Sequence, residues 1–388
     1  MTGAEWKLLL AACAGGAGES DIVRIAATLK ELEPEKPLDW QKVVRLADHH
    51  GTSSLLHPKL APCADVVPST VLASLRHDFE RNVRQSLFLA HELIRVLDGM
   101  EEHGVEVIPY KGIALSELYY GDMAVRQSGD IDLFVRKGDV ARGKNVLREL
   151  GYVPRTTIPQ NAEADYVATA YEWAFDNPEG KNLLELQWAL QPRFYAVDLD
   201  MDGPFERAET ATVAGRRVKT FAPEDLLLML AVHAAKHVWG RLIWLCDIAQ
   251  ILQRRNLNWD RVQARARELG IQRILHLTLL LGNRFLSMAI PAPMEQAIRA
   301  DLAAHQLAEE IAVAVAAGVS YVEPQVSYFR LMMRLRERRV DRMRFLSRLT
   351  FTPGPGEWEA VRLPRVLAPV YRVVRLGRLA ARFARGSG

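Results

Sequence analysis

The chain has 388 residues, of which 49% are apolar and 25% are charged, which is the composition of an ordinary globular protein. This composition excludes collagen, a continuous coiled coil and wholesale disorder, and three scattered cysteines are too few for a disulfide scaffold. The cysteines form neither a CxxC pair nor a zinc spacing, so we interpret them as reduced thiols in a reducing compartment. Because no apolar run approaches the roughly 20 residues of a membrane span, we expect a cytoplasmic protein.

The net charge of +3 is distributed unevenly along the chain. From Pro324 to the end the sequence holds 15 arginines against 4 acidic residues, a net charge of +11, so residues 1–323 carry a net charge of −8. The basic character therefore belongs to a C-terminal tail and not to the part of the chain that precedes it.

Apolar periodicity predicts helices over the first 100 residues. One helix begins at Asp39 and ends at Gly51, and a longer one runs from Pro68 to His103 with apolar residues at three- and four-residue steps. The pattern then changes to that of a mixed α/β unit, in which short strands alternate with helices. The elements predicted there are strands over 105–109, 131–135, 166–175 and 183–188, helices over 113–120 and 138–150, and a hairpin around Gly215.

Helical periodicity returns at Pro223, which begins a helix, and continues to about Ala317. Pro353–Gly356 breaks the pattern, and beyond Arg362 the spacing predicts an amphipathic helix with arginines on one face. We therefore expect an α/β (α+β) fold with a small mixed sheet between helical regions. The expected division is a helical region over 1–100, an α/β core over 101–221, a helical domain over 222–323 and a basic tail over 324–388.

Two aspartates in the second predicted strand carry the strongest chemical signal. Asp130 and Asp132 point to the same side of the strand, and two carboxylates about 7 Å apart in an apolar strand are costly without a counter-ion. Mg²⁺ supplies such a charge and is usually held by one or two carboxylates together with substrate phosphates. Glu185 lies in a later apolar strand, and three convergent carboxylates can hold two metal ions about 4 Å apart. The alternative for the two aspartates alone is a strand end in a solvated turn.

The segment before these aspartates has the character of a phosphate site. Lys111 and Gly112 lie between a predicted strand and a predicted helix, where a glycine lets backbone N–H groups approach a phosphate. Lys111 and Arg126 offer positive charge to a triphosphate, although Arg126 has the alternative of pairing with Asp130 or Asp132. Neither a P-loop nor a dinucleotide-binding motif is present elsewhere in the sequence.

These motifs follow one another in a set order: Lys111-Gly112, a helix, Arg126, the segment Asp130–Leu133 and the acid Glu185 in a later strand. This order resembles that of the nucleotidyltransferase fold of the DNA polymerase β superfamily. More narrowly, it is similar to a bacterial family of uncharacterised nucleotidyltransferases, which occur in genomes near genes that tailor peptide natural products. The resemblance continues through His233–Trp239 and Arg241–Ile248 and covers roughly residues 80–290.

The resemblance implies roles for individual residues. The implied metal ligands and catalytic carboxylates are Asp130, Asp132 and Glu185, with Mg²⁺ or Mn²⁺ as cofactor and Glu185 as ligand or as base for the acceptor hydroxyl. The implied nucleotide-binding residues are Lys111, Gly112, Arg126, Ser128 and Lys236. Three departures weaken single assignments: many superfamily members have Gly-Gly or Gly-Ser in the first motif, the third carboxylate is more commonly Asp, and Gln187 stands where close relatives have His.

A second group of polar residues follows in the helical region. His233, Lys236 and His237 share one helical face, and Asp247 lies on the next predicted helix. The resemblance implies that Lys236 reaches the triphosphate or the sugar, that Asp247 orients it and that the histidines lie in a supporting layer. One alternative is a helix–helix contact in which Asp247 pairs with Lys236 or Arg241. Another is a zinc set of the two histidines and Asp247, although no Glu follows His233 as a zinc-protease helix requires.

The basic tail has three interpretations. It covers the enzyme domain with its arginines outward, it lies on an anionic membrane surface as a peripheral anchor, or it binds RNA or another phosphate-rich partner. Its few aromatic residues argue against readout of single strands, and DNA is not among the expected partners.

Taken together, the resemblance implies an enzyme that moves a nucleoside monophosphate from ATP or another NTP to a hydroxyl acceptor and releases pyrophosphate. Tailoring of a peptide natural product is the implied setting. The alternatives are a toxin-like nucleotidyltransferase that modifies tRNA or protein, and a non-catalytic module that binds a nucleotide or a partner.

Overall fold

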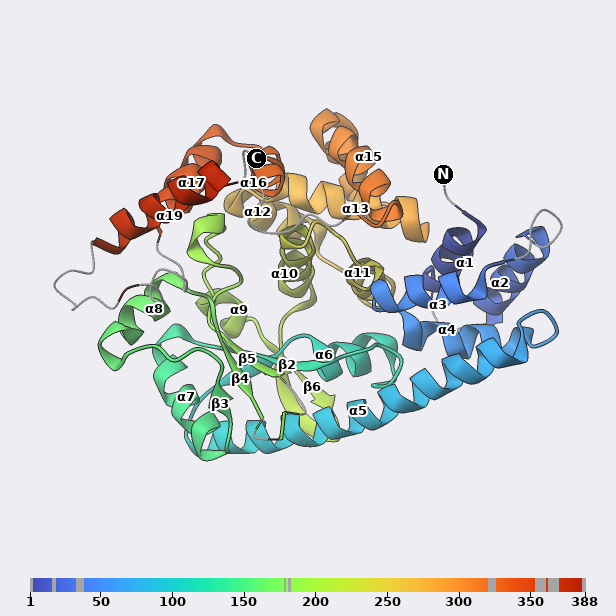
Figure 1. Cartoon of the computed structure of the whole chain (residues 1–388), viewed down its shortest axis with the longest axis horizontal. Coiled ribbons are helices and arrows are strands. Elements are labelled where there is room, and N and C mark those ends of the chain that lie inside the picture. Colours follow the sequence, from blue (N-terminus) through green and yellow to red (C-terminus); the bar gives the residue numbers. More distant parts are fainter. Residues whose placement is uncertain are drawn as a thin grey trace.

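A small mixed sheet lies between helical regions in the computed structural model, as predicted (Figure 1). The structure describes residues 3–15, 19–32, 38–177, 179–180, 183–319, 326–352, 361 and 370–385. The five strands lie in the order β1 (Val107–Pro109), β2 (Asp130–Val135), β5 (Leu183–Gln187), β4 (Glu172–Asp176) and β3 (Val153–Pro154). Only the central pair, β2 and β5, is parallel, and the other neighbours are antiparallel.

One face of this sheet is covered by two helices. The 34-residue helix α5 (Ser69–Glu102) runs along the lower edge of Figure 1, with α7 (Val140–Glu149) beside it. Alternate residues of β2 and β5 share one buried apolar cluster with these helices, and they include Ile131, Leu133, Leu184 and Leu186 from the strands and Leu93, Val96 and Met100 from α5. Burial of these apolar side chains fixes the register, so the intervening residues of both strands point to the opposite face.

The connection from β1 to β2 contains a short helix, α6 (Gly112–Leu115), which continues into a wider π turn over Ser116–Tyr120. The helix predicted over 113–120 is thus confirmed, with a start one residue earlier. The predicted hairpin is also confirmed, as β6 (Glu209–Val213) and β7 (Arg216–Thr220). Its two-residue loop has positive φ at both Ala214 and Gly215, as in the turns that favour hairpins.

The strand predicted over 166–175 is wrong in its first half. Residues Glu163–Thr169 form helix α8, and the strand begins only at Glu172. Glu163 and Asp165 lie in the first turn of this helix, where negative charge is favoured by the helix dipole. The ammonium of Lys144 also pairs with the Glu163 carboxylate at 2.5 Å, which ties α8 to α7.

The helices that precede the sheet in the sequence and those that follow it share one apolar core. The ring centroids of Trp6 and Phe285 lie 5.8 Å apart although the residues are almost 280 positions apart in sequence. The helices before α5 are α1 (Ala4–Cys13), α2 (Glu19–Leu32), α3 (Trp40–His49) and α4 (Ser53–Leu60). Those after the hairpin are α10 (Pro223–Lys236), α11 (Leu242–Arg254), α12 (Trp259–Leu269), α13 (Gln272–Leu286), α14 (Ala292–Ala300) and α15 (Leu302–Ala316). The remaining short elements are α9 (Asp202–Glu206) and 3₁₀ turns over Ala61–Cys63, Lys137–Asp139, Gln160–Ala162 and Arg193–Tyr195.

The three cysteines form no disulfide. Cys13, Cys63 and Cys246 are all buried, and Sγ of Cys246 donates to the Cys13 carbonyl oxygen at 3.9 Å. Within the described part of the chain, no helix combines the length and apolarity needed to cross a membrane.

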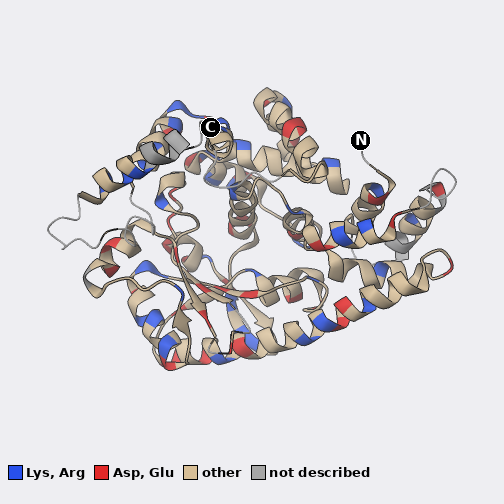
Figure 2. Ribbon diagram, in the orientation of Figure 1, with Lys and Arg blue, Asp and Glu red and all other residues tan. Residues whose placement is uncertain are grey.

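The described part of the basic tail packs on the preceding helices and loops. It contains α16 (Val326–Arg334), α17 (Arg339–Phe351) and α19 (Tyr371–Arg385), and Figure 2 shows arginines along these helices. Arg348 pairs with Asp198, and the Glu337 carboxylate accepts hydrogen bonds from the first two N–H groups of α13 at 3.2 Å each. These contacts agree with a tail that covers the rest of the protein, while binding to a membrane or to RNA stays a prediction. The predicted break at Pro353–Gly356, Arg362 and the side chains that follow Arg378 lie outside the described residues.

Candidate active site

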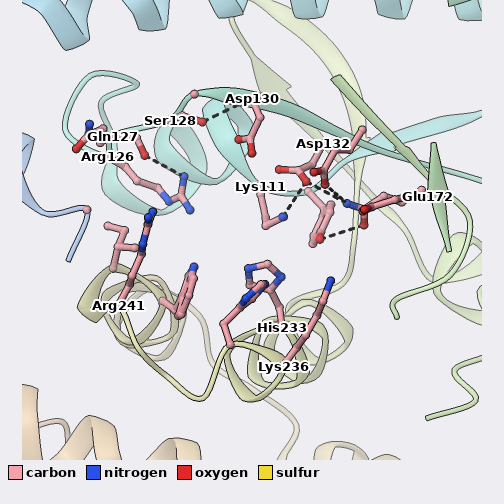
Figure 3. Close-up of a pocket in the computed structure, with 18 of the residues that line it drawn as sticks. Lys111, Arg126, Gln127, Ser128, Asp130, Asp132, Glu172, His233, Lys236 and Arg241 are labelled. Carbon is pink, nitrogen blue, oxygen red and sulfur yellow. Dashed lines mark hydrogen bonds and ion pairs between the residues drawn. The ribbon is translucent and has the colours of Figure 1, made fainter. Parts of the chain in front are cut away.

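The sheet face opposite α5 borders a cavity of about 660 Å³, closed on its other side by α10, α11 and the loop between them (Figure 3). Most of the residues singled out in the sequence line this cavity, namely Lys111, Arg126, Ser128, Asp130, Asp132, Glu185, His233, Lys236 and His237. Gly112 and Asp247 do not line it but contact residues that do. The structure therefore brings together groups from β2, β5 and the α10–α11 pair, which are up to about 120 residues apart.

The strand register places three carboxylates on the cavity face. Asp130 and Asp132 are two positions apart on β2, and Asp132 lies directly opposite Glu185 on the parallel neighbour β5. Directly paired residues on neighbouring strands point to the same side, so Glu185 shares the face of both aspartates. The Asp132 side chain is almost fully buried, with 3% of the residue exposed.

Gln187 joins two of these carboxylates. Its Nε2 donates to Oδ1 of Asp132 at 3.1 Å and to Oε2 of Glu185 at 2.8 Å, while its Oε1 accepts from the Tyr110 hydroxyl at 3.2 Å. The amide thus orients both acids at once. A neutral glutamine performs this role where a histidine is expected in close relatives.

The carboxylates share limited countercharge. Nζ of Lys111 lies 2.7 Å from Oδ1 of Asp132, and the nearby acidic groups hold the pKa of Lys111 well above its usual value although burial opposes this. Burial raises the pKa of Asp132 to about 6 against the effect of Lys111, and the negative charge of Glu185 adds to the rise. Burial also raises the pKa values of Asp130 and Glu185. Burial and mutual repulsion therefore disfavour negative charge on Asp130, Asp132 and Glu185 at the same time, and a bound cation would relieve this cost.

Gly112 occupies a position that a side chain would crowd. Its φ is +57°, and a Cβ there would lie 3.1 Å from the carbonyl oxygen of Asp130 and 3.1 Å from Oγ of Ser128. Ser128 itself is buried, and its hydroxyl donates to the Asp130 carbonyl at 3.4 Å. The glycine thereby lets the start of α6 pack directly on the strand that carries the aspartates.

We expect Gly112→Ala to lower the free energy of unfolding by about 1–2 kcal/mol, because alanine is strained at positive φ and its Cβ would push on the Asp130 backbone. Urea denaturation measures this change. Gly138→Ala is the matched control, since a Cβ at Gly138 meets no atom within 4 Å. Equal stability of the two variants would contradict the tight packing inferred at Gly112.

Arg126 pairs with Asp247 in a buried, two-bonded contact. Its Nε lies 2.8 Å from Oδ1 and its Nη2 lies 2.9 Å from Oδ2, and the Tyr120 hydroxyl also donates to Oδ1 at 2.8 Å. Among the alternatives considered for Arg126 and Asp247, this pairing between them was not anticipated. It joins the segment before β2 to α11. Arg126 lies at the cavity wall with all three guanidinium nitrogens engaged, because its Nη1 also donates to the Gln127 carbonyl at 3.5 Å.

His233 and Lys236 of α10 lie across the cavity from the aspartates (Figure 3), and His237, which directly follows α10, lines the same cavity. Nζ of Lys236 donates to the Tyr171 hydroxyl at 2.8 Å and lies 4.4 Å from the centre of that ring. The His237 ring stacks on Trp244 with centroids 5.0 Å apart, and burial together with the charge of Lys111 holds the pKa of His233 well below its usual value. Because Asp247 is engaged by Arg126, it neither pairs with Lys236 nor completes the alternative zinc set.

The sequence analysis missed Glu172 and Tyr171. Glu172 of β4 lies directly opposite Gln187, so it points to the same face as Glu185 and lines the same cavity. Burial raises the pKa of Glu172, and the charge of Lys236 partly offsets this. The alternation of Glu172 and Ala174 with buried Trp173 would have revealed it, had the strand been predicted to begin at residue 172.

The residues present fit a divalent cation held jointly with phosphates. Oδ2 of Asp132 is buried and has no hydrogen-bond partner among the described residues, so it offers an unsatisfied anionic ligand beside Asp130. Among the same residues, no three His, Cys, Asp or Glu side chains converge closely enough to form a ready-made metal cage. Mg²⁺ seldom uses an all-protein cage and takes substrate phosphates as ligands, which agrees with two protein carboxylates.

The small mixed sheet between helical regions has the fold class that the sequence resemblance implies. A family model matches residues 36–287, well over half of the chain, and the protein belongs to the family described as "Uncharacterised nucleotidyltransferase".

The other comparisons add little. No curated protein matches the sequence. A solved structure, that of an antigenic nucleotidyltransferase-like protein from Paracoccidioides brasiliensis, is 16% identical, and the match covers 54% of this chain and 94% of that chain. Its TM-score of 0.28 is too low to support a conclusion about fold or function.

Proposed function

We propose that the protein transfers a nucleoside monophosphate from an NTP to a hydroxyl acceptor, with Mg²⁺ or Mn²⁺ as cofactor. The observation that carries this proposal is the placement of Asp130, Asp132 and Glu185 on one face of two neighbouring strands, beside Lys111, in one cavity. Bound at Asp130 and Asp132, the cation would neutralise charge on the phosphates and on the leaving pyrophosphate.

The residues of the chain have separate tasks in this reaction. Lys111 lies beside Asp132 and adds positive charge where the triphosphate meets the carboxylates. The Arg126 guanidinium, fixed by Asp247, does the same from the segment that precedes β2. Lys236 reaches the cavity from α10 and is placed to contact the sugar or the phosphates.

Glu185 is the proposed base. The acceptor oxygen bonds to the α-phosphorus, the bond from that phosphorus to the bridging oxygen breaks, and pyrophosphate leaves with the bonding electrons. The proton of the acceptor hydroxyl passes to the Glu185 carboxylate, whose pKa is raised by burial and thus lies closer to neutral pH. No covalent enzyme intermediate is required, so catalysis rests on positioning and charge neutralisation.

Calorimetric titration with each NTP, in Mg²⁺ and in EDTA, tests the proposal. We expect binding that requires Mg²⁺ and is lost when Asp130→Asn and Asp132→Asn are combined. The control is Asp341→Asn, which removes an aspartate buried in an ion pair with Arg338 in the tail. Absence of NTP binding by the folded wild type would refute the proposal and favour a module that binds a partner.

A further inference from the structure

A second cavity of about 300 Å³ adjoins the first. The two cavities share Lys236, His237, Arg241 and Trp244, which form the boundary between them. The outer wall of the second cavity is formed by Tyr328 of α16 and by Val315 near the end of α15. A ligand seated there therefore lies next to the proposed NTP site but outside the carboxylate cluster.

The charge of the lining residues changes sign between the two cavities. The first contains the four carboxylates of the sheet face, whereas the described residues that line the second include no Asp or Glu. Both Lys236 and Arg241 line the second cavity. Arg241 is exposed, and its guanidinium has neither a hydrogen bond nor an ion pair among the described residues. The second cavity therefore favours an anionic group, which the guanidinium can bind with two hydrogen bonds.

The other walls are flat or apolar. Trp244 is stacked on His237, with 29° between the ring planes, and Val238 and Val315 add aliphatic surface. Tyr328 faces the same space and is held by a hydrogen bond from its hydroxyl to the Lys236 carbonyl at 2.7 Å. Such walls suit a flat ring next to the anionic group.

The loop that presents these groups is strained and firmly held. Val238 and Trp239 both have positive φ, 52° and 48°, a backbone conformation that is strained for residues other than glycine. The N–H of Trp239 donates to the Ala234 carbonyl at 2.8 Å, and its indole donates to the Thr278 hydroxyl at 3.1 Å. Strain retained by such contacts is typical of functional loops, and here it places Arg241 at the boundary between the cavities.

We propose that the second cavity binds the acceptor, and that the acceptor is a small molecule with a carboxylate or phosphate beside a flat ring. The anion would bind Arg241 and the ring would lie against Trp244, so that a hydroxyl on the same molecule extends past the boundary towards Glu185. This inference rests on the proposed function, because only a transferase has an acceptor.

Calorimetry on the full chain tests the inference with two probes, 4-hydroxybenzoate and phenyl phosphate, which separate a carboxylate from a phosphate. Each is titrated into protein that holds Mg²⁺ and a non-transferable ATP analogue with a methylene between the α- and β-phosphates. We expect at least one probe to bind, and Arg241→Gln to weaken it about tenfold, as for the loss of a charge-assisted hydrogen bond. Arg261→Gln, at an exposed arginine of α12 away from both cavities, should leave the affinity unchanged. Phenol and inorganic phosphate should each bind more weakly than the probe that combines ring and anion.

The outcomes separate this inference from the proposed function, because binding of the ATP analogue is measured first on the same samples. If the analogue binds but neither probe does, or if Arg241→Gln leaves probe binding unchanged, the acceptor site is refuted and the proposed function stands. If Arg241→Gln weakens the analogue instead, the second cavity belongs to the nucleotide and the inference is likewise overturned. If the analogue fails to bind, the proposed function falls, and the assignment of an acceptor falls with it.

Discussion

Replacing Asp247 with alanine is expected to lower the free energy of unfolding by about 3–5 kcal/mol, as for removal of one partner from a buried ion pair. The variant would leave the Arg126 guanidinium buried, with 7% of that residue exposed, and without the carboxylate that accepts the hydrogen bonds of its Nε and Nη2. It would also remove the acceptor of the Tyr120 hydroxyl. Urea denaturation measures the change.

Two further variants show whether the buried charge is the cause. Glu80→Ala breaks an exposed pair with Arg76 on α5 and should change the free energy of unfolding far less than Asp247→Ala does. Combining Arg126→Met with Asp247→Leu removes both charges and should restore much of the lost stability. If Asp247→Ala were as mild as Glu80→Ala, the pair would not hold the two parts of the site together.

The carboxylate arrangement could be predicted from local pattern because it obeys a local rule. Residues two positions apart on a strand share a face, so Asp130 and Asp132 had to lie together wherever the strand packed. The position of Glu185 opposite Asp132 cannot be predicted from local pattern, because it depends on which strands become neighbours and in which register. The sequence suggested an acid in a later strand, and the parallel pairing of β2 with β5 brings it into the same cavity.

The residues that were not predicted depend on distant contacts or on an element boundary. Arg126 and Asp247 are 121 positions apart, and nothing in the periodicity of either segment specifies their pairing. Glu172 was missed because residues 166–175 were assigned to one strand, whereas its first half forms α8. Aromatic residues such as Tyr166 favour strands by propensity, but here acidic residues in the first turn and burial of Tyr166 against Trp173 stabilise a helix.

Glu185 of β5 and Glu172 of β4 both point to the cavity and are candidates for the base, and the geometry separates them. Glu185 is linked to Asp132 through Gln187, so it belongs to the group that would surround the α-phosphate. Glu172 lies one strand further away, and its charge is opposed by Lys236. A base has to reach the acceptor hydroxyl while that oxygen approaches the phosphorus, so the proposed function assigns this task to Glu185.

We expect Glu185→Gln to slow transfer by about 10²–10⁴-fold while Mg²⁺-dependent NTP binding persists, because glutamine fills the same space but cannot take the proton. Glu172→Gln is the matched control on the neighbouring strand and should slow transfer far less. The measurement is transfer of label from ATP labelled at its α-phosphate to acceptors in a cell extract, with the titration in Mg²⁺ run on the same preparations. Equal losses of transfer in the two variants would mean that the acidic face acts only through its total charge, whereas undiminished transfer by Glu185→Gln would assign the proton to another group.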